Sequence, residues 1–394
     1  MPPILPRDLG PALRSTARLY PVVYLTGPRQ SGKTTLARSL FPSHRYVNLE
    51  ALDERERALT DPRGFLVEYG KGAILDEVQH APELLSYLQG EVDERPTPGR
   101  FVLTGSENLA LSARVGQSLA GRAGILHLLP LSLEEVGRFP NPPMGLWETV
   151  LAGGYPRIHQ LGIPPGKWLA DYTTTYVERD VRQLLRVGDL HAFGTFLRLL
   201  AGRTAQELNL SSLGADAGIH HATARAWLSV LEASYLVFRA PPWHRNTGKR
   251  AVKAAKVHWY DTGLVCHLLG IRDADQLRHH PLRGAIFESW VAAEMAKTLL
   301  HRGEPADLFH LRRTLGLEVD LLHERGRELL AVECKSGETA ADAFGAPLLR
   351  FREEVLRSGE AAEVIPVVVF GGDKSHRRSG VRFTSWRDVP RLQG

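Results

Sequence analysis

The sequence has 394 residues, of which 43% are hydrophobic and 24% charged, and its formal net charge is +5. This composition is typical of a folded globular protein, and the length exceeds what one hydrophobic core usually serves, so we expect two or three domains and no long disordered region. There is no apolar run of the roughly 18 residues that a membrane span needs, the first residues lack the apolar core of a signal peptide, and two isolated cysteines exclude a disulfide framework, so we expect a cytoplasmic protein with no membrane partner.

Four short apolar runs lie in the first part of the chain, at residues 22–26, 46–49, 73–76 and 101–104. They lack polar alternation, which is typical of strands in a parallel sheet that is covered on both faces. Helical patterns lie between them, for example at 34–40 and 83–89. We therefore predict an α/β multidomain protein that begins with a doubly wound, parallel-sheet domain over residues 1–165.

A glycine-rich loop follows the first of these strands and leads into a helix. Its sequence is Gly27-Pro28-Arg29-Gln30-Ser31-Gly32-Lys33-Thr34, followed by Thr35. This is the Walker A pattern, in which backbone amides and a helix N-terminus cradle phosphate groups. Lys33 is expected to reach the β- and γ-phosphates and the hydroxyl of Thr34 to ligate Mg²⁺, so ATP and Mg²⁺ are the predicted cofactors. The alternative, a glycine-rich turn with an incidental lysine, fits the flanking strand and helix less well.

The third apolar run ends in two acidic residues, Asp76 and Glu77. An apolar strand with this ending is a Walker B pattern. Asp76 is expected to hold Mg²⁺ through water, and Glu77 to polarise the water that attacks the γ-phosphate. The pair therefore indicates hydrolysis as well as binding.

Small polar residues end the fourth run, and two arginines follow on the next predicted helical stretch. Thr104 or Ser106 could contact the γ-phosphate or the attacking water, although Ser106 could equally cap a helix. Arg114 and Arg122 are candidates for an arginine finger that acts on the nucleotide of a neighbouring subunit. Arg122 is preferred because Gly121 precedes it in a turn, and a solvated surface arginine is the alternative.

Helices dominate the middle of the chain, which we assign to a helical and winged-helix-like domain over residues 166–275. Residues 205–239 have the pattern of a helix-turn-helix followed by a strand. The basic residues that follow are accompanied by no acid, as expected of a wing that lies beside a DNA backbone. A solvated hairpin is the alternative. The candidate DNA-binding residues are Arg239, Arg245, Lys249, Arg250, Lys253 and Lys256.

The last part, residues 276–394, contains an alternating pattern that predicts a β-hairpin with its turn at Gly326 and Arg327. Leu317, Val319 and Leu321 are expected on one face, with Glu318 and Asp320 on the other. Counting back from the turn makes Asp320 and Glu333 near neighbours, with Lys335 two residues further on.

Two close carboxylates repel each other unless a cation lies between them, and Mg²⁺ is the usual solution. Glu288, on the preceding predicted helix, could supply a third oxygen. The metal ligands would be Glu288, Asp320 and Glu333, and the catalytic residues Asp320, Glu333 and Lys335, which matches the PD-(D/E)XK nuclease pattern. An exposed hairpin with a cross-strand Lys–Glu pair is the alternative.

Taken together, these segments resemble a prokaryotic family of AAA+-type ATPases whose C-terminal domain, of unknown function, resembles PD-(D/E)XK nucleases. The resemblance spans nearly the whole chain and rests on residues 27–35, 74–79, 103–106, 119–122, 153–156, 257–264, 287–288, 318–320 and 333–335. It implies an ATPase that assembles into a ring, such as a hexamer, with sites at the subunit boundaries.

Three functions follow from this organisation. The leading hypothesis is an ATPase that translocates or remodels branched or duplex DNA, as in recombination or repair, and carries a Mg²⁺-dependent nuclease module. The second is a nucleotide-controlled signalling or scaffold switch whose C-terminal fold is catalytically inactive. The third is a DNA translocase in which the basic wing matters and the carboxylates do not.

Overall fold

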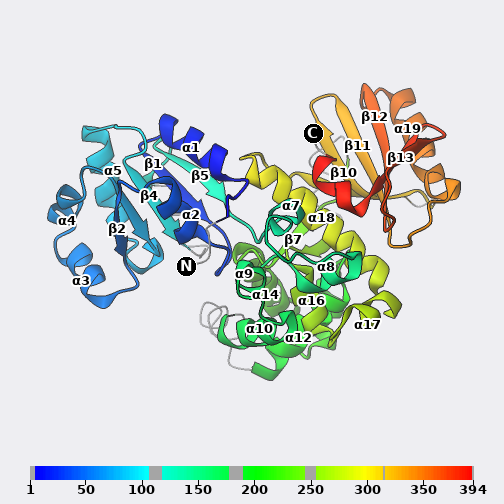
Figure 1. Ribbon diagram of the computed structural model, residues 1–394, viewed down its shortest axis with the longest axis horizontal. Coiled ribbons are helices and arrows are strands. Elements are labelled where there is room, and N and C mark those ends of the chain that lie inside the picture. Colours follow the sequence, from blue (N-terminus) through cyan, green and yellow to red (C-terminus); the bar gives the residue numbers. More distant parts are fainter. Residues whose placement is uncertain (1–4, 106–117, 177–189, 245–253, 314–315, 393–394) are drawn as a thin grey trace.

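The computed structural model describes residues 5–105, 118–176, 190–244, 254–313 and 316–392. Two α/β units, one at each end of the chain, flank a central helical unit (Figure 1). Within the described ranges, no helix is both long enough and apolar enough to cross a membrane.

The N-terminal unit is built on a five-stranded parallel sheet of order β2-β3-β4-β1-β5. Its strands are β1 (Val22–Thr26), β2 (Arg45–Asn48), β3 (Ala73–Asp76), β4 (Phe101–Gly105) and β5 (Ala123–His127). The four predicted strands are confirmed. The prediction missed β5, because β5 is an edge strand with Ile125 exposed and so lacks a continuous apolar run.

Helices cover both faces of this sheet. Alternate residues of β1 point to opposite faces: Val23 and Leu25 pack with α1 (Gly10–Leu19) and α2 (Lys33–Leu40), whereas Val22 and Tyr24 share a core with α4 (Pro62–Glu68) and α5 (Leu84–Glu94). Helix α3 (Leu52–Thr60) adds Ala58 to that second core. The predicted doubly wound arrangement is therefore confirmed.

The central unit contains the two helices and the strand predicted for the helix-turn-helix. These are α13 (Leu210–Asp216), α14 (His221–Ala233) and β7 (Val237–Ala240), and β7 lies in a three-stranded antiparallel sheet of order β6-β8-β7. The other elements are α7 (Leu133–Val136), α8 (Leu146–Ala152), α9 (Pro156–Leu161), α10 (Pro165–Tyr172), α12 (Leu190–Gly202), β6 (Gln206–Glu207), β8 (Lys256–Trp259), α16 (Thr262–Leu268) and α17 (Ala274–His279). Helices α8 and α9 precede the expected boundary at residue 165, yet they share the core of the central unit.

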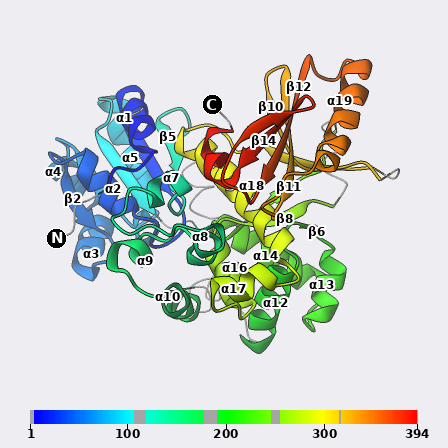
Figure 2. The same ribbon diagram turned by 45° about the vertical axis from the view of Figure 1, so that its right-hand side comes forward.

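The C-terminal unit is a six-stranded mixed sheet of order β13-β14-β12-β11-β10-β9. It is formed by β9 (Leu308–Arg312), β10 (Glu318–Arg325), β11 (Glu328–Lys335), β12 (Glu363–Phe370), β13 (His376–Arg378) and β14 (Val381–Ser385), with helices α18 (Arg283–His301) and α19 (Ala346–Ser358). Side chains of α18 pack on one face of the sheet and those of α19 on the other. Helix α18 lies between the central helices and this sheet in both views (Figures 1 and 2).

The predicted hairpin is confirmed, since β10 and β11 pair antiparallel around the turn at Gly326. The expected face of β10 is wrong, however. Leu317 and Val319 pack with α19, whereas Leu321 packs with α18. The reason is an irregularity in the pairing of β9 with β10 between Val319 and Leu322, because one extra residue reverses the alternation.

A buried aspartate joins two segments that carried the family resemblance. Asp261 accepts hydrogen bonds from the backbone N–H groups of Leu264, at 3.0 Å, and Gly154, at 2.7 Å. The neighbouring Gly153 has φ +66°, and a Cβ placed on it would lie 2.4 Å from an oxygen of Asp261. The glycine pair therefore allows the chain after α8 to close against the N-terminus of α16.

Replacing Gly153 by Ala tests this junction. We expect a loss of about 1–3 kcal/mol of unfolding free energy from the forced contact, in addition to left-handed backbone strain. Gly162→Ala is the matched control, because Gly162 has φ +62° and a Cβ placed on it would have no neighbouring atom within 4 Å. Urea unfolding followed by tryptophan fluorescence measures both variants, and equal losses would contradict the proposed contact.

Candidate nucleotide site and C-terminal carboxylate cluster

The phosphate-binding loop connects β1 to α2 at the carboxyl edge of the sheet. Gly27 has φ +143°, and a Cβ there would lie 2.2 Å from the carbonyl oxygen of Leu128. Gly32 is the left-handed N-cap of α2, with φ +94°, and its helix start has no side-chain cap among the described residues. The first-turn N–H groups of α2 are therefore available to an anion.

Lys33 is folded back onto its own loop. Its buried ammonium donates to the carbonyl oxygens of Gly27 and Pro28, both at 2.9 Å. Burial lowers the pKa of Lys33 to about 8, although the charges of Glu77 and Asp76 oppose this shift. The amine is therefore mostly protonated at neutral pH and lies where it can exchange carbonyl oxygens for phosphate oxygens.

Asp76, at the end of β3, accepts hydrogen bonds from side chains of three different elements. The hydroxyl of Thr34 donates to its two oxygens at 2.9 and 3.1 Å, and Thr104 donates to Oδ1. The structure thus brings together three residues that the sequence predicted. It adds Tyr46, whose hydroxyl donates to Oδ2 at 2.7 Å and which the sequence analysis missed.

Glu77 follows directly, in a left-handed conformation with φ +56° that non-glycine residues seldom adopt. Its carboxylate accepts a hydrogen bond from the side-chain amide of Gln79, and its N–H donates to the hydroxyl of Thr104 at 3.4 Å. A backbone held in this region beside a P-loop is the kind of strain that accompanies functional sites. Glu77 is therefore placed as the sequence predicted, directly after the strand end and beside Asp76.

The residues of the site suit a Mg²⁺-nucleotide. The hydroxyl of Ser31 is fully buried and, within the described part of the chain, has no hydrogen-bond partner. The Thr34 hydroxyl and the Asp76 carboxylate are hard oxygen donors of the type that Mg²⁺ prefers. A cavity of about 640 Å³ adjoins the loop, and its lining includes Gly32, the exposed Thr35, apolar residues such as Leu36 and Phe139, and charged residues such as Arg7, Asp8, Arg14 and Arg138.

The outer part of the loop contacts the central unit. The guanidinium of Arg29 lies 5.6 Å from the ring centre of Tyr176, and the hydroxyl of Tyr172 donates to the carbonyl of Arg29 at 3.5 Å. Gln30, next to it, is exposed and has φ +63°. Residues of α10 and the turn after it are therefore in direct contact with the loop.

Arg122 does not reach the nucleotide site of its own chain. It precedes β5, whose first residue pairs with the start of β1, whereas the loop follows the end of β1. Its guanidinium is paired with Asp93 at 2.5 Å. Arg122 therefore lies away from the nucleotide site of its own chain, and its role as a finger on a neighbouring subunit stays a prediction. Ser106 and Arg114 lie outside the described residues.

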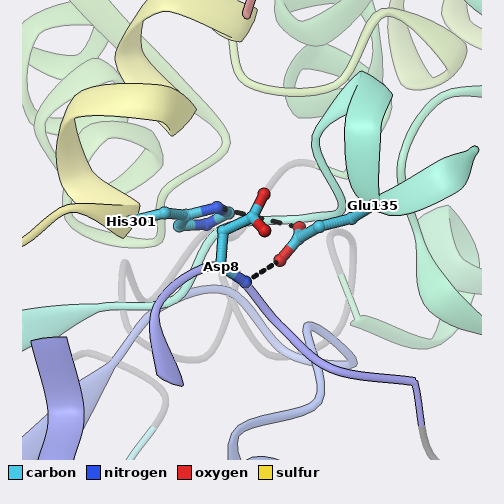
Figure 3. A group of neighbouring side chains, drawn as sticks. All are labelled: Asp8, Glu135 and His301. Atoms are coloured by element: carbon cyan, nitrogen blue, oxygen red, sulfur yellow. Dashed lines mark hydrogen bonds and ion pairs between the residues drawn. The ribbon is translucent and has the colours of Figure 1, made fainter. Parts of the chain in front are cut away.

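The inner part of the loop is tied to α18 through a buried ion pair. Arg7 donates to the carbonyls of Ser31, at 2.6 Å, and Leu129, at 2.8 Å, and to the carboxylate of Glu135 at 2.8 Å. On the other side of Glu135, Nδ1 of His301 lies 3.7 Å from Oε2 (Figure 3). One carboxylate thus links the loop, the end of β5 and the last turn of α18.

Asp8, Glu135 and His301 form the one group among the described residues in which three metal-type ligand atoms lie within 4.8 Å of one another. The backbone N–H groups of Asp8 and Ser132 already donate to Glu135, at 2.7 and 2.9 Å. Burial would raise the pKa of Glu135, but the charge of Arg7 and the hydrogen bonds from Arg7 and Ser132 lower it to about 2; His301 adds positive charge only in acid, because burial lowers its own pKa to about 4. Because protein donors already occupy the carboxylate oxygens of Glu135, we interpret this group as a buried ion pair with its hydrogen-bond partners and not as a metal site.

The C-terminal carboxylates surround a lysine. The buried ammonium of Lys256, on β8, lies 2.8 Å from Glu288 and 3.4 Å from Asp320, and Glu318 adds a third oxygen at 3.5 Å. Burial would lower the pKa of Lys256, but these carboxylates raise it above its ordinary value. The prediction that Lys256 contacts DNA is therefore wrong, since the side chain is buried between the central and C-terminal units.

Asp320 and Glu333 are neighbours, as predicted, but they bind different partners. Oδ2 of Asp320 accepts from the N–H of Cys334 at 2.9 Å, and Glu333 pairs with Lys335 at 2.6 Å. Burial and the charge of Asp320 raise the pKa of Glu333 to about 7, against the effect of Lys335. Over the described ranges, the predicted metal ligands Glu288, Asp320 and Glu333 do not bring three oxygens within 4.8 Å of one another.

Little of the predicted DNA-binding set can be placed. Arg239 is exposed and pairs with Glu232 at 2.5 Å. Arg245, Lys249, Arg250 and Lys253 lie outside the described residues.

The sheet order, the loop and the acidic strand end define a P-loop ATPase of the AAA type. In agreement, residues 19–137 match a family model described as an AAA domain. Residues 144–275 and 283–388 match two domains of unknown function, DUF8612 and DUF4143.

The chain belongs to the same family as two uncharacterized mycobacterial proteins. These are Rv2008c of Mycobacterium tuberculosis and Mb2031c of Mycobacterium bovis, each 32% identical over 339 residues, which cover 84% of this chain and 74% of the relative. Among solved structures, the Walker-type ATPase PABY2304 of Pyrococcus abyssi covers 66% of this chain and 94% of its own, at 16% identity and a TM-score of 0.42. A point variant of RuvB from Thermotoga maritima covers 59% of this chain and 88% of its own, at 19% identity and a TM-score of 0.31.

The low pKa of Glu135 predicts an acid-dependent contribution to stability. Because the folded-state pKa of about 2 lies below the ordinary value of 4.5, the contribution is present above pH 4.5 and is lost as the pH falls toward 2. Glu135→Gln should therefore remove about 3 kcal/mol at neutral pH, and the difference from wild type should shrink below pH 4.5. Urea unfolding over a pH series measures this difference in unfolding free energy between the variant and wild type.

Glu134→Gln is the control for this prediction, because Glu134 is the exposed neighbour in the same helix. A stability difference for Glu135→Gln that stays constant from pH 6 to pH 3 would contradict the ion-pair interpretation.

Proposed function

We propose that this protein hydrolyses ATP with Mg²⁺ at its N-terminal site and uses the nucleotide state to control its central and C-terminal units. The observation that carries the proposal is that Lys33, Thr34, Asp76, Glu77 and Thr104 meet at the carboxyl edge of one parallel sheet. A bound Mg²⁺ would neutralise charge on the phosphoryl group being transferred.

Each of these residues has a definite task. The loop amides and Lys33 bind the β- and γ-phosphates, and Thr34 and Asp76 hold the metal. Glu77 orients a water molecule and accepts its proton, with Gln79 fixing the carboxylate. Thr104 supports both acidic residues, because it donates to Asp76 and accepts from the Glu77 N–H.

Control of the other units is supported by contacts that begin in the loop itself. Arg29 contacts Tyr172 at the end of α10 and Tyr176 after it, and Ser31 connects through Arg7 and Glu135 to the end of α18. A change of loop conformation on nucleotide binding would therefore act on both units. Assembly into a ring, with Arg122 as a finger in trans, is part of the proposal.

Duplex or branched DNA is the partner that we propose for the central unit. The support is the pair of helices α13 and α14 followed by two paired strands, together with the acid-free basic sequence between Arg239 and Lys253.

For the C-terminal unit we favour an inactive nuclease-like fold over an active nuclease. The gathering of Asp320, Glu333 and Lys335 at neighbouring strand ends supports the likeness to PD-(D/E)XK nucleases. Against metal-dependent cleavage, Lys256 already supplies the positive charge between Glu288 and Asp320. Metal-dependent cleavage of branched DNA is the second candidate function.

Two substitutions separate nucleotide binding from hydrolysis. Lys33→Ala should abolish Mg²⁺-ATP binding, whereas Glu77→Gln should retain binding and lose turnover by about 10²-fold or more, because it removes the proton acceptor. Titration calorimetry and a phosphate-release assay, each with and without duplex and four-way DNA, measure the two effects. Glu56→Gln, an exposed change on α3, is the control. Wild-type turnover in Glu77→Gln would contradict the assigned role.

A cleavage assay decides between the two C-terminal functions. With Mg²⁺ or Mn²⁺ and ATP, we expect wild type to leave linear, forked and four-way DNA intact, because Lys256 occupies the place of a metal ion. Cleavage by wild type that Asp320→Asn abolishes while ATPase activity is retained would favour the nuclease instead.

A further inference from the structure

Tyr46 lies on β2, the edge strand next to the strand that ends in Asp76. In the parallel pairing of β2 with β3, Asn48 is opposite Asp76 and Tyr46 is opposite Ile74. The backbone of Tyr46 therefore lies two residues before the level of Asp76 in the sheet, and its long side chain covers the difference. The hydroxyl lies 2.7 Å from Oδ2 of Asp76.

The two oxygens of Asp76 have different sets of donors, which have Thr34 in common. Thr104 and Thr34 donate to Oδ1, the latter at 2.9 Å, whereas Tyr46 gives Oδ2 its shortest bond and Thr34 a longer one of 3.1 Å. If the Thr34 hydroxyl ligated a metal ion instead of donating to Asp76, Tyr46 would remain as the donor to Oδ2. A phenol that holds a ligating carboxylate sets its orientation and basicity, as outer partners of metal ligands do.

The ring of Tyr46 is held in place from the other side. The guanidinium of Arg38, in the last turn of α2, lies 4.7 Å from the ring centre. A tyrosine hydroxyl is protonated at neutral pH, so the hydroxyl of Tyr46 acts as a donor to Asp76. Its ring thus spans from the P-loop helix to the acidic strand end.

We propose that Tyr46 is a positioning residue for the metal site, which fixes the Asp76 carboxylate and thereby sets the affinity for the Mg²⁺ that accompanies the nucleotide. The inference rests on the Mg²⁺-nucleotide binding part of the proposed function and does not need hydrolysis. Tyr46 touches neither nucleotide nor metal and acts through Asp76.

The test is Tyr46→Phe, which removes one hydroxyl and keeps the ring. ATP affinity is measured by titration calorimetry in EDTA and over a series of free Mg²⁺ concentrations. We expect the Mg²⁺-free affinity for ATP to stay within about 2-fold. The Mg²⁺ concentration that gives half of the full effect should rise about 3- to 10-fold, at or below the lower end of the losses that follow when a partner of a metal ligand is removed.

Tyr87→Phe is the matched control, since Tyr87 is comparably exposed and lies on α5. An unchanged Mg²⁺ midpoint in Tyr46→Phe would overturn the inference, and so would an equal loss of affinity with and without Mg²⁺, which would show a structural effect on the loop. A wild-type chain that binds no Mg²⁺-ATP would overturn the proposed function as well. One that binds but does not hydrolyse would overturn hydrolysis alone.

Discussion

The buried carboxylate of Asp76 is the interaction on which the nucleotide edge depends. Asp76 is only 4% exposed, and a buried charge is costly unless hydrogen bonds compensate for lost water. Its donors come from β2, β4 and the P-loop helix, through Tyr46, Thr104 and Thr34. One charge therefore fixes three elements that are far apart in sequence, and it does so where a metal ion would bind.

Buried charges also lie where the units meet. Glu135 and Arg7 connect the loop to the end of α18, and Lys256 connects β8 to the other half of the same helix through Glu288. Glu288 and His301 are 13 residues apart (301 minus 288), about 20 Å along a helix. Breaking a buried pair by removing one partner costs much more than breaking a surface pair, so these contacts favour one arrangement of the units over others. Helix α18 is in contact with both ends of the proposed switch.

Prediction from the sequence succeeded where chemistry and spacing are local. The loop, the Asp76–Glu77 strand end and the antiparallel pairing of β10 with β11 each depend on residues within a few positions, and all three are present. Prediction failed where a residue far away in the sequence determines the contacts of a side chain. In the sequence, the last lysine of the basic stretch resembles the basic residues before it, but Lys256 begins β8 and contacts Glu288, which comes 32 residues later. Tyr46 gave no signal, because only the pairing of β2 with β3 places it near Asp76. The bulge in β10 is likewise set by its partner β9.

The most direct test of the nucleotide site is a crystal structure with Mg²⁺ and a non-hydrolysable ATP analogue. We predict the triphosphate against the amides of residues 27–34, with Lys33 released from the carbonyls of Gly27 and Pro28, and the metal on Thr34 beside Asp76. A nucleotide bound elsewhere, or a Lys33 still turned onto its own loop beside bound triphosphate, would contradict it.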